Sequence, residues 1–326
     1  MNMKTKLQTL LLLFLITITA NAQQESTYWD NLKDRESTLG IEEGFTEVKT
    51  DEFTLKLVNA SQTVAGLYPN SDPDFDFTPG ERIEIRDKDG IYYIGDLNFR
   101  IKGADGEWKS FSTAKHRKKV EALSVSGNVL AAADLSNTLG EENPLSIKRY
   151  YEKKDGGLVL RFEIKNPTSK SVEIGALGTP MAFNNILEGK HLDETHADNV
   201  FFDPYIGNDA GYLEVKHLTG EGEALLVLPE SNMPFEAYRP LNDDPSNRSI
   251  VFEGVHEWMA LSKAYAEKEW KDKDQWNKPT SLSLGAGETQ NFALKFVLAP
   301  SIKEIQDKLI EEQRPVTVGV PGYVLP

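Results

Sequence analysis

Apolar and polar residues alternate along most of the chain after residue 45, which is typical of β-strands with one buried face. The clearest case is the run at residues 158–165, where Leu158, Leu160, Phe162 and Ile164 occupy every second position. Similar runs predict strands at residues 53–58, 97–101, 108–112, 120–135, 145–152, 172–177, 211–217 and 224–228. So many short strands between turn residues predict a mainly β protein.

Two β-hairpins are also expected. At residues 82–94, Ile83 and Ile85 alternate with charged residues, and the Asp-Lys-Asp-Gly sequence at residues 87–90 is typical of a hairpin turn. The second hairpin joins strands at residues 281–284 and 291–298 through the Gly-Ala-Gly sequence at residues 285–287.

The C-terminal part of the chain contains the strongest helix signal. Ser301 and Glu304 match a capping box. An apolar stripe at helical spacing follows, made of Ile302, Ile305, Leu309 and Ile310. We therefore expect a helix at residues 301–313, and residues 264–273 are also rich in helix formers. The apolar run at residues 314–326 is either a strand on the sandwich or an extended tail toward a further part of a longer chain.

The first 22 residues have the organisation of a secretory signal peptide. Lys4 and Lys6 precede an apolar stretch at residues 10–18, and Ala20-Asn21-Ala22 matches the small-x-small cleavage pattern. The stretch is shorter than the about 20 residues that span a bilayer, so an uncleaved anchor is the less favoured alternative. We expect a secreted or periplasmic protein without membrane contact after cleavage, in which a polar segment at residues 23–45 precedes the fold.

The composition limits the kinds of partner that the protein is expected to bind. The chain has no cysteine and a formal net charge of −15. A protein without disulfides depends on its hydrophobic core, and about 300 residues can bury a sufficient one. The acidic charge argues against nucleic acid and anionic membranes as partners. One basic cluster, at residues 115–119, is expected to be a solvated turn.

No metal ion or cofactor is expected. The five histidines do not have a zinc-binding spacing. Asp72, Asp74 and Asp76 resemble the start of a calcium loop, but the glycine and the glutamate that an EF-hand needs later in the loop are absent. The sequence also contains neither a glycine-rich phosphate loop nor a nucleophile elbow.

The densest group of polar and aromatic residues lies at residues 201–212. Asp203, Tyr205, Asn208 and Asp209 combine carboxylate and amide groups for sugar hydroxyls with an aromatic face for the apolar side of a sugar ring. These four residues are therefore candidates for carbohydrate binding. The alternative is a structural loop held by Asx turns.

Two further segments carry the same residue types. Residues 235–239 include Glu236, Tyr238 and Arg239, for which the alternative is an edge strand with a cross-strand Glu–Arg pair. Residues 256–276 hold a second set, which forms either a stacking platform or part of the core: His256, Glu257, Trp258, Trp270 and Trp276. Glycoside hydrolysis needs two carboxylates about 5 to 9 Å apart. The catalytic candidates are Asp203, Asp209, Glu236 and Glu257.

The stretch RFEIKNPTSKSVEIGALGTPMAFNN, at residues 161–185, resembles a segment of galactose-mutarotase-like domains. In those domains an Asn-Pro-Thr-like turn precedes a strand that leads into a residue cluster on the concave face, so the resemblance makes Asn184 and Asn185 candidates for substrate binding. Residues 281–309 resemble the last hairpin and exit helix of such domains. The implied fold is a galactose-mutarotase-like β-supersandwich at residues 46–300 with a C-terminal linker helix.

Further stretches resemble the N-terminal region of a secreted fungal and bacterial family of unknown function, among them LYPNSDPDFDFTPGER, FFDPYIGNDAGYLEV and FEGVHEWMALSKAYAEKEW. Some members of that family are labelled glycoside hydrolases. The resemblance implies a carbohydrate partner and an (α/α)6 helical toroid, encoded downstream or acting in trans. It does not transfer any catalytic residue to this chain.

Three functions are compatible with these features of the sequence. The first is the β-sandwich portion of a glycoside-hydrolase-like enzyme that acts on polysaccharides or oligosaccharides. The second is a non-catalytic module that binds glycans or serves as a scaffold. The third is a mutarotase-type epimerase, which needs a His–Glu pair on one face. His256 and Glu257 are poor candidates for that pair, because neighbours on a strand point to opposite faces.

Overall fold

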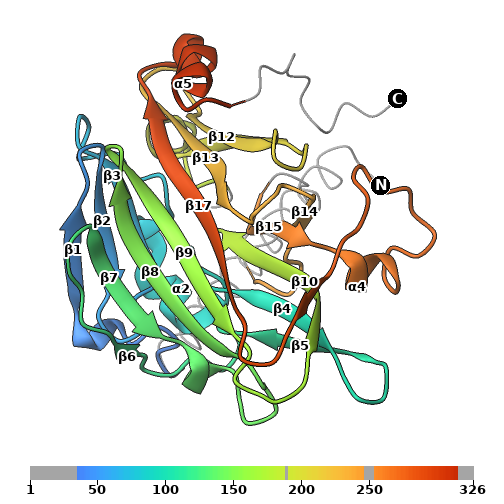
Figure 1. Cartoon of the computed structure of the whole chain (residues 1–326). Helices are drawn as coiled ribbons and strands as arrows, with labels where there is room; N and C mark the ends of the chain where they lie inside the picture. The colour runs from blue at the N-terminus through green and yellow to red at the C-terminus, as the bar shows by residue number, and fades with distance from the viewer. Residues whose placement is uncertain (1–34, 188–189, 246–252, 315–326) are drawn as a thin grey trace, which may run out of the picture.

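The computed structural model describes residues 35–187, 190–245 and 253–314, and these residues form three antiparallel sheets (Figure 1). The predicted signal peptide, most of the polar segment after it and the C-terminal run beyond Arg314 lie outside the described residues. Within the described part of the chain, no helix has the length and apolar character needed to cross a membrane.

Strand order defines the three sheets. The eight-stranded sheet has the order β11 (Val200–Tyr205), β12 (Tyr212–His217), β13 (Ala224–Ser231), β17 (Thr289–Ala299), β9 (Gly157–Lys165), β8 (Ser146–Lys154), β7 (Val129–Asp134) and β6 (Glu121–Ala122). The six-stranded sheet has the order β14 (Ala237–Pro240), β15 (His256–Leu261), β10 (Val172–Met181), β4 (Asn98–Lys102) and β5 (Trp108–Ser112), with β16 (Leu282–Leu284) paired to β10. The three-stranded sheet contains β1 (Phe45–Lys49), β2 (Phe53–Val58) and β3 (Val64–Pro69).

Short helices connect the strands. The 3-10 helices are η1 (Ile41–Glu43), η2 (Gly80–Arg82), η3 (Ser136–Thr138) and η4 (Ile302–Glu304). The α-helices are α2 (Ile83–Asp89), α3 (Leu192–Asp198), α4 (Lys263–Ala266) and α5 (Ile305–Glu311).

One hydrophobic core joins the eight-stranded and the six-stranded sheets. Phe162 of β9 and Phe292 of β17 belong to the same buried cluster as Ile101 of β4, Leu177 of β10 and Trp258 of β15. Complete burial of one such side chain contributes roughly 1.5 to 3 kcal/mol relative to its exposure. The β-sandwich therefore has one face of each large sheet in its interior and leaves the opposite face of the six-stranded sheet available for other contacts.

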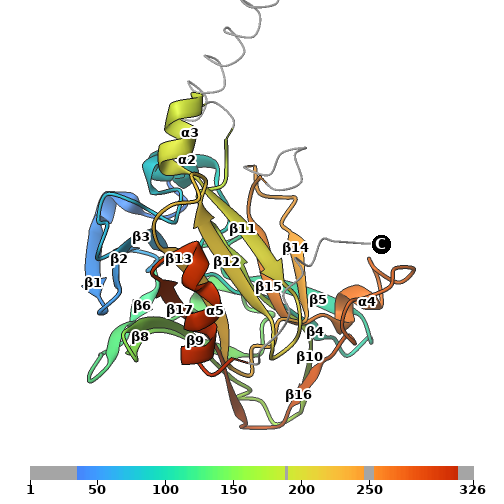
Figure 2. The same ribbon diagram turned by 90° about the horizontal axis from the view of Figure 1, so that it is seen from above.

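A second apolar cluster covers the outer face of the eight-stranded sheet. Ile305 and Leu309 of α5 pack with Leu226 of β13 and Val297 of β17. Figures 1 and 2 show α5 against this part of the sheet. The predicted C-terminal helix is thus present, and its apolar stripe is the reason that it lies on the sheet.

Most of the predicted strands are present. The run at residues 158–165 forms β9, and its apolar positions are buried while Arg161, Glu163 and Lys165 are not. The mainly β prediction is correct because the two-residue period of these strands matches a sheet with one face in the core. Strand β1 precedes the first strand that the pattern predicted.

The hairpin predicted at residues 82–94 is wrong. This part of the chain contains η2 and α2 instead. Its polar residues are buried rather than exposed: Arg86 donates to the carbonyl of Tyr92 at 2.7 Å, and Asp87 accepts from the backbone nitrogen of Leu39 at 2.9 Å. These long-range contacts favour the helix over the alternation that Ile83 and Ile85 suggested.

The hairpin predicted at residues 281–298 is also wrong, because its two strands belong to different sheets. β16 pairs with β10, whereas β17 pairs with β9 and β13 (Figure 2). The buried amide of Asn166 explains the separation. Its Nδ2 donates to the carbonyls of Lys170, Leu284 and Gly285 at 2.7, 2.9 and 3.0 Å, which holds the end of β16 beside the turn between β9 and β10.

The two helix predictions differ in outcome. The predicted C-terminal helix starts as η4 before α5, but the capping box is not formed, because Oγ of Ser301 bonds to Oε2 of Glu304 at 2.8 Å and not to the helix backbone. The segment at residues 264–273 contains only the four-residue helix α4, followed by turns. Tyr265, Glu269 and Trp270 of this irregular segment line a cavity on the six-stranded sheet.

Replacement of Asn166 by alanine tests the link between the sheets. We expect Asn166→Ala to lower the free energy of unfolding by about 2 to 4 kcal/mol, because it leaves three carbonyls without their shared donor. Chemical denaturation monitored by circular dichroism measures the change. Asn128→Ala is the matched control, since the exposed amide of Asn128 makes one hydrogen bond of 3.3 Å, and its expected effect is within about 0.5 kcal/mol. Equal effects of the two substitutions would contradict this role of Asn166.

Candidate functional site

A cavity of about 720 Å³ lies on the face of the six-stranded sheet that is turned away from the core. Its floor is formed by residues of β4, β5, β10 and β15. Its walls are formed by the end of β14 with Asn242 and Asp243, by residues 139–142, and by Tyr265, Glu269 and Trp270. Known ligand pockets have volumes of roughly 300 to 1,000 Å³, so the cavity has the size of a small-molecule or saccharide site.

Strand β15 places two adjacent residues on opposite sides of the sheet. Trp258 has an exposed fraction of 0% and stacks on Phe235 in the core, with the ring centres 3.8 Å apart. Glu257 points the other way, lines the cavity and has an exposed fraction of 1%. His256 packs in the interior against Phe202 and Tyr238. The expectation that His256 and Glu257 face opposite sides is therefore confirmed, which argues against their acting as one catalytic pair.

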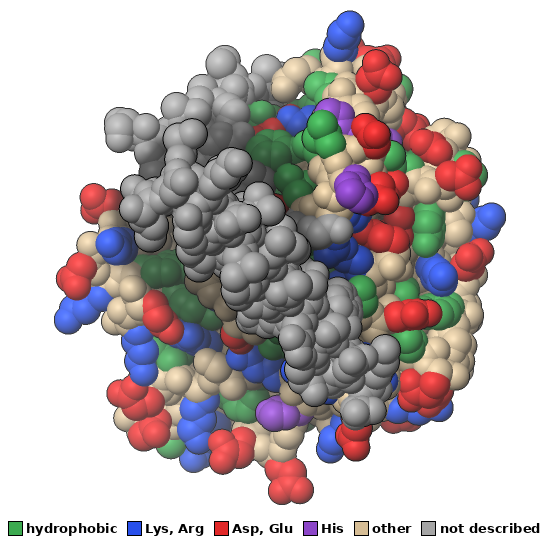
Figure 3. All heavy atoms as spheres, turned by 180° about the vertical axis from the view of Figure 1, so that it is seen from behind, with side chains coloured by type: hydrophobic (Ala, Val, Ile, Leu, Met, Phe, Trp, Pro, Cys, Tyr) green, Lys and Arg blue, Asp and Glu red, His purple; other side chains and the backbone are tan. Residues whose placement is uncertain are grey.

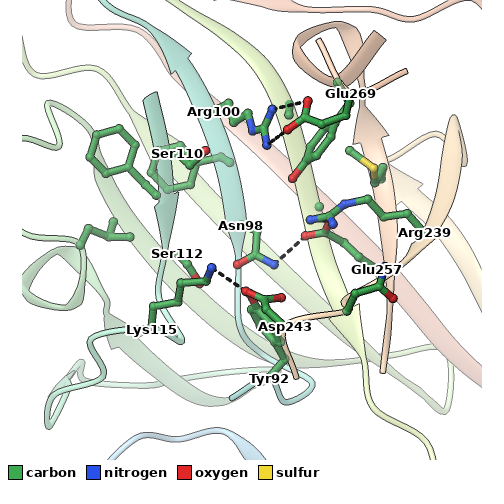
Figure 4. Close-up of a pocket in the computed structure, with 18 of the residues that line it drawn as sticks. Tyr92, Asn98, Arg100, Ser110, Ser112, Lys115, Arg239, Asp243, Glu257 and Glu269 are labelled. Atoms are coloured by element: carbon green, nitrogen blue, oxygen red, sulfur yellow. Dashed lines mark hydrogen bonds and ion pairs between the residues drawn. The ribbon is translucent and has the colours of Figure 1, made fainter. Parts of the chain in front are cut away.

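Polar and charged side chains form three groups along the cavity (Figure 4). The first contains Arg100 and Glu269, the second contains Asn98, Glu257 and Arg239, and the third contains Tyr92, Lys115 and Asp243.

The central group holds a buried carboxylate. Nδ2 of Asn98 donates to Oε1 of Glu257 at 2.7 Å, and Nη2 of Arg239 lies 2.7 Å from Oε2. Gly178 of β10 makes room for this side chain, because a Cβ atom there would lie 2.5 Å from Cδ of Glu257. Burial raises the pKa of Glu257, and the charge of Arg239 and the hydrogen bond from Asn98 offset only part of the effect.

Two aromatic rings and two guanidinium groups form the wall beside Glu257. The ring centre of Tyr265 lies 3.8 Å from Cζ of Arg100 and 4.5 Å from Cζ of Arg239. Trp270 stacks on Tyr265, with ring centres 5.1 Å apart. Arg100 also donates to both carboxylate oxygens of Glu269, at 2.9 and 2.6 Å. Burial alone would raise the pKa of Glu269, but the hydrogen bonds and charge of Arg100 lower it below its ordinary value.

The third group contains a second ionised carboxylate. Asp243 accepts a hydrogen bond of 2.9 Å from the hydroxyl of Tyr92 and lies 2.6 Å from Nζ of Lys115. Burial opposes ionisation of Asp243, yet Lys115 and Tyr92 outweigh it and lower the pKa of this carboxyl. The cavity therefore contains carboxyl groups whose pKa values are displaced in opposite directions, an arrangement that separates a proton donor from an ionised carboxylate.

Three of the residues predicted from sequence meet in this cavity: Arg239, Glu257 and Trp270. The sequence-based interpretation missed Asn98, Arg100, Tyr92 and Asp243. Asn98 and Arg100 occupy the outward positions of a predicted strand, where polar residues are expected in any solvated sheet. Their spacing of two residues was the available signal, but only the register with β10 and β15 brings them to Glu257.

The candidates at residues 201–212 lie elsewhere. Asp203 forms an ion pair with Lys216, and Tyr205 stacks on Tyr212 with ring centres 4.6 Å apart. Asn208 exchanges backbone hydrogen bonds with Phe235, and Asp209 is exposed. None of these four residues lines the cavity described above.

Most of the other candidates hold the fold together. Glu236 accepts hydrogen bonds from Ser262 and Thr280. Asn184 donates to Glu81 and to the carbonyl of Asp198, and Asn185 donates to the carbonyl of Gly254. Tyr238, His256 and Trp258 pack in the interior of the sandwich. Trp276 has an exposed fraction of 59% and does not line the cavity.

The basic cluster at residues 115–119 is only partly a solvated turn. Lys118 and Lys119 are exposed, as expected. The side chain of Arg117 is buried and forms an ion pair of 2.5 Å with Asp96, and Lys115 reaches Asp243 at the edge of the cavity. Acidic and basic side chains are interspersed over the described part of the face shown in Figure 3. No group of three or more potential metal ligands occurs within residues 35–187, 190–245 and 253–314.

Comparison with known proteins identifies the fold. A model of DUF5695, a family of unknown function, matches residues 56–326. A polysaccharide lyase superposes with a TM-score of 0.60 at 12% identity, and the match covers 82% of this chain and 35% of the lyase. No curated protein sequence matches the chain.

Two galactose mutarotase-like proteins are also similar. The protein from Lactobacillus casei ATCC 334 has a TM-score of 0.47 at 12% identity over 78% of this chain and 100% of that chain. The protein from Clostridium acetobutylicum has a TM-score of 0.46 at 10% identity over 78% of this chain and 94% of that chain. The predicted mainly β class, with strands in large antiparallel sheets and a short C-terminal helix, is confirmed.

The opposite pKa displacements predict opposite pH effects on stability. The raised pKa of folded Glu257 contributes stability below the ordinary value of 4.5, and this contribution is lost as pH rises through the folded pKa. We therefore expect the stability of the wild type relative to Glu257→Gln to fall with increasing pH, as measured by denaturant unfolding at several pH values.

Glu269→Gln is the control with the opposite sign. Its lowered pKa adds stability above the ordinary value of 4.5, and that stability is lost as pH falls through the folded pKa. The stability of the wild type relative to Glu269→Gln should rise with pH. A rise for Glu257→Gln as well would mean that the charge of Arg239 outweighs burial.

Proposed function

The chain belongs to the family of unknown function DUF5695, and from the geometry of its cavity we propose that it is a secreted carbohydrate-active protein that binds a saccharide on the six-stranded sheet. The observation that most directly supports this proposal is that the hydrogen-bonded carboxylate of Glu257 and the stacked rings of Tyr265 and Trp270 line the same cavity of about 720 Å³.

Saccharide recognition needs polar groups of fixed orientation and an aromatic surface. Carboxylates and amides bond to hydroxyls, while an aromatic ring packs against the apolar face of a sugar. In this cavity Asn98 and Arg239 fix Glu257, and Tyr265 supports Trp270.

The carboxyl groups also favour a catalytic role, hydrolysis of a glycosidic bond. Glu257, with its raised pKa, is the candidate for the acid that protonates the leaving oxygen. Asp243, with its lowered pKa, is the candidate for the ionised partner. The alternative is a module that binds a glycan without cleaving it, with the same cavity and the same aromatic contact.

We also propose that the chain acts together with a second domain and outside the cytoplasm. The chain spans 35% of the polysaccharide lyase with which it shares its fold. We propose that a helical domain, encoded downstream or acting in trans, completes the catalytic site. The signal-peptide pattern of the first 22 residues supports secretion or a periplasmic location.

Two tryptophans provide a matched test of binding. Trp270 lines the cavity, whereas Trp276 lies close to it in sequence but outside the lining. We expect Trp270→Ala to weaken oligosaccharide binding about tenfold, the equivalent of roughly 1.4 kcal/mol, and Trp276→Ala to leave it unchanged. Isothermal titration calorimetry with plant, fungal and algal oligosaccharides measures both. The reverse order of effects would place the saccharide outside this cavity.

Reducing-end detection on the same panel separates the two roles. New reducing ends that disappear in Glu257→Gln support hydrolysis. Binding without new reducing ends leaves a glycan-binding module, and an absence of saccharide binding refutes the proposed function itself.

A further inference from the structure

Arg100 is held in a fixed position at one end of the cavity. It projects from β4, its side chain has an exposed fraction of 14%, and its guanidinium lies against the ring of Tyr265 at 3.8 Å. Both of its terminal nitrogens bond to the two oxygens of Glu269. This planar, two-point contact is the geometry in which arginine binds carboxylates most selectively.

The carboxylate that occupies this position is free to leave. Glu269 follows α4 in the irregular wall segment, and its side chain has an exposed fraction of 47%. A half-exposed carboxylate regains its hydration when it turns away, and exposed ion pairs contribute only about 0.2 to 1 kcal/mol. Arg100 is mostly buried, so its guanidinium is more stable when a new carboxylate replaces Glu269 than when it has no partner.

The second arginine on the same ring is different. Arg239 lies 4.5 Å from the ring centre of Tyr265, but its partner Glu257 has an exposed fraction of 1%. Release of Arg239 would leave a buried carboxylate without its counter-charge, which costs several kcal/mol. Of the two guanidinium groups beside Tyr265, Arg100 is therefore the one with an exchangeable partner.

We infer that Arg100 binds the carboxylate of an acidic saccharide, a uronic acid, and that Glu269 occupies this position when the saccharide is absent. The inference rests on the proposed saccharide binding and narrows its substrate class. Binding exchanges one carboxylate for another at Arg100, and no covalent bond changes. The adjacent ring of Trp270 is positioned to contact the same sugar.

Charge around the cavity favours a single carboxylate over a densely charged polymer. Glu141, Glu142 and Asp243 line the cavity as well, and the whole chain has a net charge of −15. These negative charges repel a polyanion. At Arg100, in contrast, one carboxylate replaces another, so the charge beside the guanidinium stays the same.

Uronic acids and their methyl esters test this inference, since the ester removes the charge and adds only one methyl group. The probes are D-glucuronate, D-galacturonate and the methyl ester of each, measured by titration calorimetry at pH 7. The wild type should bind one of the acids at least tenfold more tightly than its ester. Glu269→Gln should bind that acid several-fold more tightly still, because the competing internal carboxylate is gone, with no change for the ester.

Two arginine variants complete the test. Arg100→Lys, which keeps the charge but not the fork, should lose most of the preference for the acid. Arg161→Gln is the matched control, because Arg161 also pairs with a glutamate, Glu152, and lies 3.9 Å from a tyrosine ring, but on the eight-stranded sheet. Arg161→Gln should bind the acid and the ester with the affinities of the wild type. Thermal unfolding verifies that each variant is folded.

Four outcomes would overturn the inference. Equal affinity for acid and ester, in the wild type and in Glu269→Gln, would remove the role of Arg100 while saccharide binding still stands. Weaker binding of the acid by Glu269→Gln would make Glu269 part of the binding site and not a substitute for the ligand. If neutral oligosaccharides bind but no uronate does, the substrate class is wrong and the proposed function survives. If no saccharide binds at all, both fail.

Discussion

The cavity depends on the compensation of one buried carboxylate. Glu257 of β15 is nearly inaccessible to solvent, and it is stable there because Arg239 of β14 and Asn98 of β4 each hold one oxygen. β10 lies between β15 and β4, and Gly178 is the position at which the side chain of Glu257 passes over it. The contact therefore requires the correct register of four neighbouring strands, so that the fold of the sheet and the geometry of the site are determined together.

The two faces of the six-stranded sheet have different roles: the inner face stabilises the fold, and the outer face forms the candidate binding site. The inner face contributes Trp258, Leu177 and Ile101 to the core of the sandwich. The outer face has a small apolar cluster of its own, in which Ala176 and Met259 pack with Trp270, and it also holds polar groups, including the guanidinium of Arg100. Irregular segments then build the walls, because turns after α4 present Glu269 and Trp270 to the cavity without the constraint of a continuous helix.

Local sequence patterns predicted the parts of the structure that depend on local rules. The alternation at residues 158–165 predicted β9 because burial of one face is a property of the strand itself. The hairpin at residues 281–298 could not be recognised as two strands of different sheets, since Asn166, more than 100 residues earlier, decides where β16 lies. The site follows the same rule: residue type identified Glu257 and Trp270, but Asn98 and Arg100 acquire their roles only through strand register.

Saccharide binding on the outer face of the six-stranded sheet can be observed in a crystal structure of the protein with a bound oligosaccharide. We expect electron density for a sugar ring against Trp270, with a hydroxyl within hydrogen-bond distance of Glu257. Density for the sugar against Tyr205 and Tyr212 on the eight-stranded sheet, with the cavity unoccupied, would contradict it.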